Sequence, residues 1–302
     1  MVRLNVTGRL ADFRPSPRRP PRAAYVLPTL FTAGNLFLGY LSILKSFEGA
    51  MLAKSGELGP NPYFDIAALA IGIAVFFDGL DGRIARLTNT VSAFGRELDS
   101  LADAITFGVA PAVLAFTWGV AFVDGELAGP FQEQLRQAGY FLAFVFLLCG
   151  AARLARFNIQ TDPAPKNPGP PDRKYFVGLP IPAAAAAIAA TVYATGSRPL
   201  GWWVFSAAFL ALLALLSFLM VSTWRYRSFK DLNLLRPRSP RSVVVLGSLI
   251  YLVWNYTRPV LLAMAVTYVG SGLVVRIGGA LRRRFRPHRE QVGKEAGTPA
   301  EG

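Results

Sequence analysis

Four aspartates stand in a fixed pattern near the ends of two apolar stretches of this chain. They are Asp78, Asp81, Asp99 and Asp103. A carboxylate at the middle of a bilayer costs about 2.5–3.5 kcal/mol to insert, so four unpaired ones cost on the order of 10 kcal/mol. Divalent cations prefer carboxylate oxygens and would cancel this charge. The pattern therefore predicts a metal-dependent site at one face of a membrane.

The first two aspartates share a helix face with small residues. Each residue of a helix advances about 100°, which places Asp81 about 60° from Asp78. Gly82 and Ala85 fall close to the same direction, and Arg86 follows beside them. Small residues let a ligand or another backbone approach closely. This helix end therefore presents two carboxylates, two small residues and one cation.

The second pair of aspartates repeats the arrangement on the next apolar stretch. Gly95, Asp99 and Asp103 are spaced by four residues and form a slowly drifting row on a helix. The segment 88–93 between the two stretches is short, so the two helices are expected to be antiparallel neighbours. All four carboxylates then converge, and Pro111 is expected to bend the second helix beyond them.

Converging carboxylates suit Mg²⁺ or Mn²⁺, which are hard ions that pair with substrate phosphates. Two such ions stabilise the attacking and leaving oxygens of a phosphoryl displacement. The structural alternative is that the aspartates only anchor the helices through ion pairs with Arg83, Arg86 and Arg96. Ion pairs alone do not explain the glycine and alanine positions, so we favour the metal site.

The composition indicates an integral membrane protein. Of 302 residues, 53% are hydrophobic and only 17% are charged, against about 25% charged in soluble domains. The net charge of +14 does not indicate nucleic-acid binding, because the basic residues crowd the N-terminal tail, 225–241 and 282–289. This distribution follows the positive-inside rule. Cys149 lies in an apolar run and is read as a packing residue, and His288 in a basic tail is not expected to be catalytic.

Apolar runs predict an all-α membrane domain over 25–278, with a basic cytoplasmic arm at 1–24 and a basic and polar tail at 279–302. We expect a bundle of about eight transmembrane helices, of which the last two are marginal in length. A cytoplasmic N-terminus then places the basic clusters and the aspartates on the cytoplasmic side. The expected spans are 28–50, 64–87, 94–122, 139–157, 178–196, 201–222, 242–257 and 259–277.

The aspartate pattern, written D-x2-D-G-x2-A-R-x8-G-x3-D-x3-D, resembles the signature of the CDP-alcohol phosphotransferases. All eight defining positions are matched, at Asp78, Asp81, Gly82, Ala85, Arg86, Gly95, Asp99 and Asp103. Further segments are similar to the phosphatidylserine synthase branch of that family. They lie at 27–37, 94–111, 153–158, 178–183 and 228–231.

The resemblance implies a six-helix core followed by two C-terminal spans, and a role for each motif residue. Asp78, Asp81 and Asp99 would ligate a pair of Mg²⁺ or Mn²⁺ ions, and Asp103 would be the general base and also touch the second ion. The nucleotide would be bound by Gly82, Ala85, Arg86 and Gly95.

The resemblance also implies the reaction. CDP-diacylglycerol and L-serine would give phosphatidylserine and CMP, through attack of the serine hydroxyl on phosphorus. A homodimer in a bacterial cytoplasmic membrane, with its active site facing the cytoplasm, is also implied.

Several interpretations stay open. Arg153 and Arg156 bind the serine carboxylate or a substrate phosphate, or only anchor the helix at the cytoplasmic face. Asn35 and Thr32 line a pocket or support helix packing, and the loop 162–174 covers the acceptor site or only fixes a turn. The same chemistry would serve another acceptor alcohol, such as glycerol 3-phosphate or inositol phosphate. A divalent-metal transporter is the alternative of another class, and it would need acidic or polar residues through the whole bilayer depth.

Overall fold

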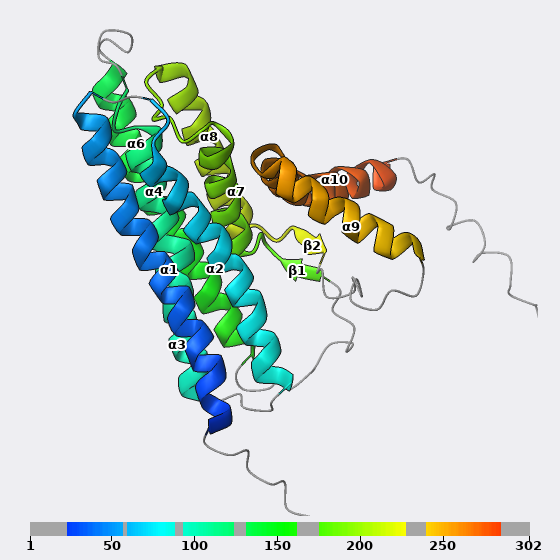
Figure 1. Ribbon diagram of the computed structural model, residues 1–302. Helices are drawn as coiled ribbons and strands as arrows, with labels where there is room; N and C mark the ends of the chain where they lie inside the picture. The colour runs from blue at the N-terminus through cyan, green and yellow to red at the C-terminus, as the bar shows by residue number, and fades with distance from the viewer. Residues whose placement is uncertain are drawn as a thin grey trace, which may run out of the picture.

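The computed structural model describes residues 23–56, 59–87, 93–123, 131–161, 175–227 and 240–284. These residues form a helical bundle with one small two-stranded sheet at its side (Figure 1). The elements are α1 (Ala23–Lys54), α2 (Pro62–Leu87), α3 (Ala93–Asp103), η1 (Ala104–Val109), α4 (Ala110–Gly119), α6 (Phe131–Thr161), β1 (Tyr175–Val177), α7 (Ile181–Ala194), α8 (Trp203–Val221), β2 (Arg225–Arg227), α9 (Pro240–Asn255) and α10 (Thr257–Arg284).

The prediction of an all-α membrane protein is confirmed. Five segments of the described chain are long and apolar enough to cross a bilayer, and α7 is a shorter apolar helix. The five are Thr29–Lys54, Pro62–Leu80, Phe94–Gly119, Phe131–Ile159 and Trp203–Val221. Helices α9 and α10 cover the last two expected spans, but they lie beyond α7 and turn away from the axis of the bundle (Figure 1).

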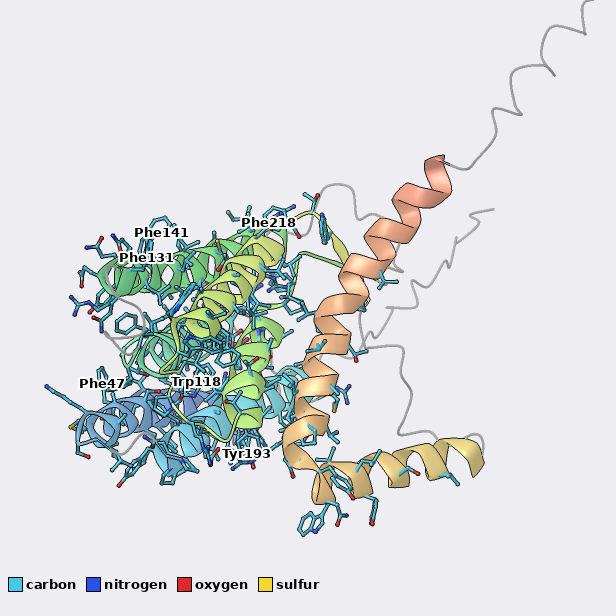
Figure 2. The ribbon with its side chains drawn as sticks, turned by 90° about the horizontal axis from the view of Figure 1, so that it is seen from above. Phe47, Trp118, Phe131, Phe141, Tyr193 and Phe218 are labelled. Carbon is cyan, nitrogen blue, oxygen red and sulfur yellow. The ribbon has the colours of Figure 1, made fainter. Side chains whose placement is uncertain are left out.

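Large aromatic residues lie both inside the bundle and on its periphery. Trp118 is only 1% exposed and lies among the helices, whereas Phe131, Phe141 and Phe218 are each more than half exposed at the edge (Figure 2). A soluble protein rarely exposes so much apolar surface. This distribution is the one expected of a bundle that is surrounded by lipid.

Small residues allow the helices of the bundle to approach closely. A Cβ atom added at Gly39 of α1 would lie 2.7 Å from the Thr106 Cα atom of η1. A Cβ atom added at Gly150 of α6 would lie 2.6 Å from the side-chain Cδ1 atom of Ile181 in α7. Glycine at such positions lets backbones pack where apolar contact alone gives little driving force in lipid.

The third span differs from the single helix expected over 94–122. It consists of α3, a six-residue π-helical turn η1, and α4. The N–H of Ala110 donates to the Ile105 carbonyl, five residues earlier. Pro111 lies in the first turn of α4 and lacks the N–H that would continue the α-helical ladder. The expected bend is therefore an interruption by a π turn, a feature that is frequent at functional sites.

Two short strands connect segments that are far apart in the sequence. Tyr175–Val177 and Arg225–Arg227 pair antiparallel, with Phe176 opposite Tyr226. Gly178 follows β1 with a φ of +81°, and a Cβ there would lie 2.5 Å from the Met220 carbonyl oxygen. Only glycine suits this position. The sheet was not expected, and it brings the chain that precedes α7 beside the chain that follows α8.

Candidate active site

Three carboxylates converge where α2 meets α3. Asp78 comes from α2, and Asp99 and Asp103 come from the last two turns of α3. Each offers an oxygen, and these three atoms all lie within 4.8 Å of one another. Asp78 and Asp99 are close enough for their charges to repel. The convergence that helical spacing predicted for these three residues is confirmed.

The donor set fits a divalent cation. The Oδ1 atom of Asp99 is buried and has no hydrogen-bond partner among the described residues. A buried charged oxygen without a partner is unfavourable, so the arrangement needs a positive charge. Within the described part of the chain, neither Asp78 nor Asp99 forms an ion pair with an arginine. The anchoring alternative required such ion pairs.

The structure describes the other residues of the motif less completely. Asp81, Gly82, Ala85 and Arg86 belong to the last two turns of α2, but their side chains lie outside the described residues. Gly95 lies in the first turn of α3 and is half-buried. Their metal- and nucleotide-binding roles therefore stay predictions, as does the role of the loop 162–174, which also lies outside the described residues.

A buried asparagine of α1 supports Asp103. The Asn35 side chain is fully buried, and its Nδ2 atom donates to Asp103 Oδ1 at 3.4 Å. Thr106 of η1 donates from Oγ1 to the Asn35 carbonyl at 3.1 Å. Thr32, one turn before Asn35, is also buried. Of the two interpretations of Asn35, helix packing and support agrees with these contacts.

The two arginines of α6, Arg153 and Arg156, differ in their exposure. Arg153 is half-buried and lies within electrostatic reach of Asp103 and of Tyr268 on α10. Its Nε atom is buried and has no hydrogen-bond partner among the described residues. The side chain of Arg156 is exposed. Arg153 is therefore placed to meet a ligand beside Asp103. Tyr268 was not singled out from the sequence, because a tyrosine in an apolar run carries no distinctive spacing.

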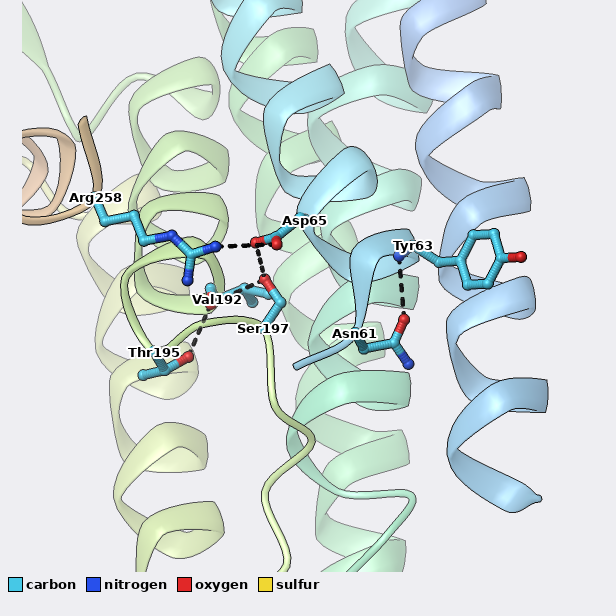
Figure 3. Close-up of polar contacts among 7 residues, drawn as sticks. All are labelled: Asn61, Tyr63, Asp65, Val192, Thr195, Ser197 and Arg258. Atoms are coloured by element: carbon cyan, nitrogen blue, oxygen red, sulfur yellow. Dashed lines mark hydrogen bonds and ion pairs between the residues drawn. The ribbon is translucent and has the colours of Figure 1, made fainter. Parts of the chain in front are cut away.

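A second polar cluster lies near the other end of α2. Asp65, in the first turn of that helix, accepts hydrogen bonds from Ser197 Oγ at 2.5 Å and from Arg258 Nη2 at 3.1 Å (Figure 3). The guanidinium of Arg258 also lies 5.0 Å from the centre of the Tyr193 ring. Sequence reasoning missed this cluster. The signal was a charged residue in each of two apolar runs, because such residues usually pair inside a membrane.

Comparisons with known proteins agree with the motif. The CDP-alcohol phosphatidyltransferase family matches residues 25–217, which include nearly all of α1, all of α2 and the converging aspartates. A CDP-diacylglycerol–serine O-phosphatidyltransferase of Helicobacter pylori is 38% identical over 71% of this chain and 77% of its own length. An archaetidylserine synthase of Methanothermobacter thermautotrophicus is 36% identical over 66% of this chain and 69% of its own.

A third relative comes from a eukaryote. The CDP-diacylglycerol–serine O-phosphatidyltransferase of Saccharomyces cerevisiae is 39% identical over 53% of this chain and 50% of its own length. The family match covers about two thirds of the chain, and it includes every residue of the eight-position motif. The protein therefore belongs to the CDP-alcohol phosphatidyltransferase family.

Proposed function

We propose that this protein transfers the phosphatidyl group from CDP-diacylglycerol to L-serine, which gives phosphatidylserine and CMP. The observation that carries the proposal is the convergence of Asp78, Asp99 and Asp103 in a chain whose relatives bear the name of that activity. The aspartates account for the phosphoryl chemistry, and the relatives account for the choice of serine.

The donor side of the site is built from carboxylates. Asp78, Asp81 and Asp99 would hold two divalent cations, Mg²⁺ or Mn²⁺. When bound, such ions neutralise the diphosphate and stabilise the oxygens of the departing CMP. Gly82, Ala85, Arg86 and Gly95 would surround the nucleotide, since small residues leave room for it and the arginine meets its phosphates.

The acceptor side is built around Asp103. Its carboxylate takes the proton of the serine hydroxyl while the serine oxygen bonds to the phosphorus that carries diacylglycerol. The bond from that phosphorus to the CMP oxygen then breaks. Asn35 keeps the base in place through its hydrogen bond to Oδ1. A positioned carboxylate acting as general base typically contributes about 10²–10⁴-fold to the rate.

Arg153 is the group that we assign to the serine carboxylate. A guanidinium binds a carboxylate through two parallel hydrogen bonds, which fixes its orientation as well as its charge. Arg156 is exposed one turn further along α6, so we assign it to anchoring the helix at the lipid head groups and not to binding the substrate.

The site would face the cytoplasm of a bacterial cell, and the working unit would be a homodimer.

A substrate panel tests the assignment. We expect the purified full-length enzyme in detergent to release CMP from CDP-diacylglycerol when L-serine and either Mg²⁺ or Mn²⁺ are present. No release is expected with glycerol 3-phosphate or inositol phosphate, or after chelation of the metal. Release with one of the phosphorylated alcohols but not with serine would overturn the choice of acceptor. Metal flux in liposomes without any CMP release would favour the transporter.

A further inference from the structure

The short helix α3 carries two of the three converging acids, and much of its surface is exposed. It contacts α1 and η1, whereas its residues Phe94 and Leu101 are 72% and 64% exposed. Rotation of this helix about its axis would move Asp99 and Asp103 together relative to Asp78. The convergence of the acids therefore depends on the contacts that fix the rotation of α3.

One such contact comes from α1. The side chain of Asn35 donates to Asp103 Oδ1 at 3.4 Å, and its backbone carbonyl accepts from Thr106 Oγ1 at 3.1 Å. Asn35 thus restrains the end of α3 that leads into the π turn. A length of 3.4 Å lies beyond the usual range of an N–H···O hydrogen bond, so this contact is a weak restraint on the rotation.

A shorter contact comes from α6. The Nδ2 atom of Asn158, in the last turn of that helix, donates to Ser100 Oγ at 2.8 Å. Both side chains are half-buried, where a hydrogen bond is stronger than at the surface. Ser100 directly follows Asp99 and lies about 60° from Asp103 around the helix axis. A contact at that angle holds the helix by its flank and leaves the two carboxylates free to face Asp78.

We propose that Asn158 is a positioning residue of the metal site: its hydrogen bond to Ser100 fixes the rotation of α3 and so keeps the two acids of that helix facing Asp78. The inference rests on the proposed function, because it takes the converging acids as the groups that hold the metal. It gives α6 a part in metal binding, although the converging acids all come from α2 and α3.

The physical reason is preorganisation. Carboxylates that are already held in place lose less conformational entropy when they bind an ion, so their affinity for it is higher. Without the bond between Asn158 and Ser100, the acids of α3 still bind the ion, but they must first be brought into register with Asp78. The affinity for the metal therefore falls, and the chemistry at a saturated site does not change.

The test is Asn158→Ala in the full-length enzyme in detergent, with Mn²⁺ binding measured from the electron paramagnetic resonance signal of the free ion. We expect the dissociation constant for Mn²⁺ to rise about three- to tenfold, the change that loss of one neutral hydrogen bond produces. The Mn²⁺ concentration that gives half-maximal CMP release should rise by the same factor, whereas the KM for serine at saturating Mn²⁺ should not change.

Asn255→Ala is the matched control for that variant. It also removes an asparagine side chain near the end of a helix, but its Nδ2 atom donates at 3.0 Å to the Tyr251 carbonyl of the same helix and is exposed. This variant should bind Mn²⁺ as tightly as the wild type. A dissociation constant for Mn²⁺ that rises equally in Asn255→Ala and Asn158→Ala would overturn the proposal.

Two changes at Ser100 show whether the hydrogen bond is the cause. Ser100→Ala removes the acceptor and should weaken Mn²⁺ binding as Asn158→Ala does, whereas Ser100→Thr keeps the hydroxyl and should bind as the wild type does. The doubly substituted Ser100→Ala, Asn158→Ala enzyme should bind Mn²⁺ no more weakly than either single variant. Equal weakening in the two Ser100 variants, or fully additive effects in the double variant, would overturn the proposal.

A purely structural role of Asn158 predicts a different result. The melting temperature of Asn158→Ala, measured with the metal chelated, would then fall while its dissociation constant for Mn²⁺ stayed at the wild-type value, and this outcome would also overturn the proposal. The proposed function is tested separately, by serine-dependent CMP release in the wild type. If that release fails, the comparison of Mn²⁺ binding still decides whether Asn158 positions the acids.

Discussion

The three converging acids have different neighbours, and we infer from this difference that they have different roles. Asp103 accepts a hydrogen bond from the buried Asn35 and faces Arg153, so its carboxylate is held toward the acceptor side. Asp78 and Asp99 face each other, and one oxygen of Asp99 has no donor among the described residues. Two carboxylates that repel each other, with no ion pair to an arginine among the described residues, suit the proposed role of metal ligands. The hydrogen-bonded Asp103 suits the proposed role of general base.

Replacing single acids by asparagine should separate these roles. Asp103→Asn removes the proposed base, and we expect kcat to fall about 10²–10⁴-fold while CDP-diacylglycerol binding is largely retained. Asp78→Asn removes a proposed metal ligand, so a higher metal concentration should be needed for turnover, and nucleotide binding should weaken as well. Turnover and equilibrium binding of CDP-diacylglycerol, each titrated with Mg²⁺, measure both effects.

Each variant serves as the control for the other, because both exchange a carboxylate for an amide of nearly the same size. Substantial residual turnover in Asp103→Asn would remove that residue from the role of base. An unaltered Mg²⁺ titration in Asp78→Asn would contradict its assignment as a ligand.

At the scale of elements, the site depends on how closely α1 approaches η1. Gly39→Ala would place a methyl group 2.7 Å from the Thr106 Cα atom and 2.5 Å from its Oγ1 atom. Backbone cannot rotate away as a side chain can, so the two helices must separate. We expect a loss of about 1–3 kcal/mol in stability, typical of overpacking, and lower activity, since Thr106 donates to Asn35.

Gly72→Ala is the matched control for that prediction. No atom lies within 4 Å of a Cβ added at Gly72, which is exposed within α2. Alanine favours a helix over glycine by about 0.5–1 kcal/mol, so the melting temperature in detergent should stay or rise. If both variants melt at the wild-type temperature, the close approach does not contribute to stability.

Much at this scale follows from the sequence, because apolar runs and helical spacing are strong local signals. They give helices at every expected span and the convergence of Asp78 with Asp99 and Asp103. They do not give the π turn, since Pro111 predicts an interruption but not its form. Strands of three residues are too short to leave an alternating pattern. The ion pair of Asp65 with Arg258 depends on where a distant helix packs, and no spacing encodes it.

At the scale of the whole molecule, the two polar clusters lie toward opposite ends of α2. The carboxylates that we assign to catalysis lie toward the end of α2 that carries Arg83 and Arg86, whereas Asp65 lies near its other end. From the positive-inside rule we propose that the first of these ends faces the cytoplasm. Strands β1 and β2 pair with each other, so the segment before α7 and the segment after α8 lie on the same side of the membrane.

Cysteine labelling tests this orientation. In a Cys149→Ser background, which removes the single native thiol, Ser55→Cys lies after α1 and Thr223→Cys lies between α8 and β2. Both positions are exposed. An impermeant maleimide added to intact cells that express the protein should label the first and reach the second only after the membrane is opened. The reverse pattern would place the active site outside.

The π turn between α3 and α4 has a consequence for how this chain can change over time. A π turn amounts to one extra residue in an α-helix, so it offsets the rotation of everything after it by about 100°. Asp99 and Asp103 lie before η1, and the core residues Leu114 and Trp118 lie after it. Deletion of one residue from η1 would restore a regular α-helix and rotate the acids by about 100° relative to those core residues. The acids could then no longer face Asp78 while Leu114 and Trp118 stay in the core.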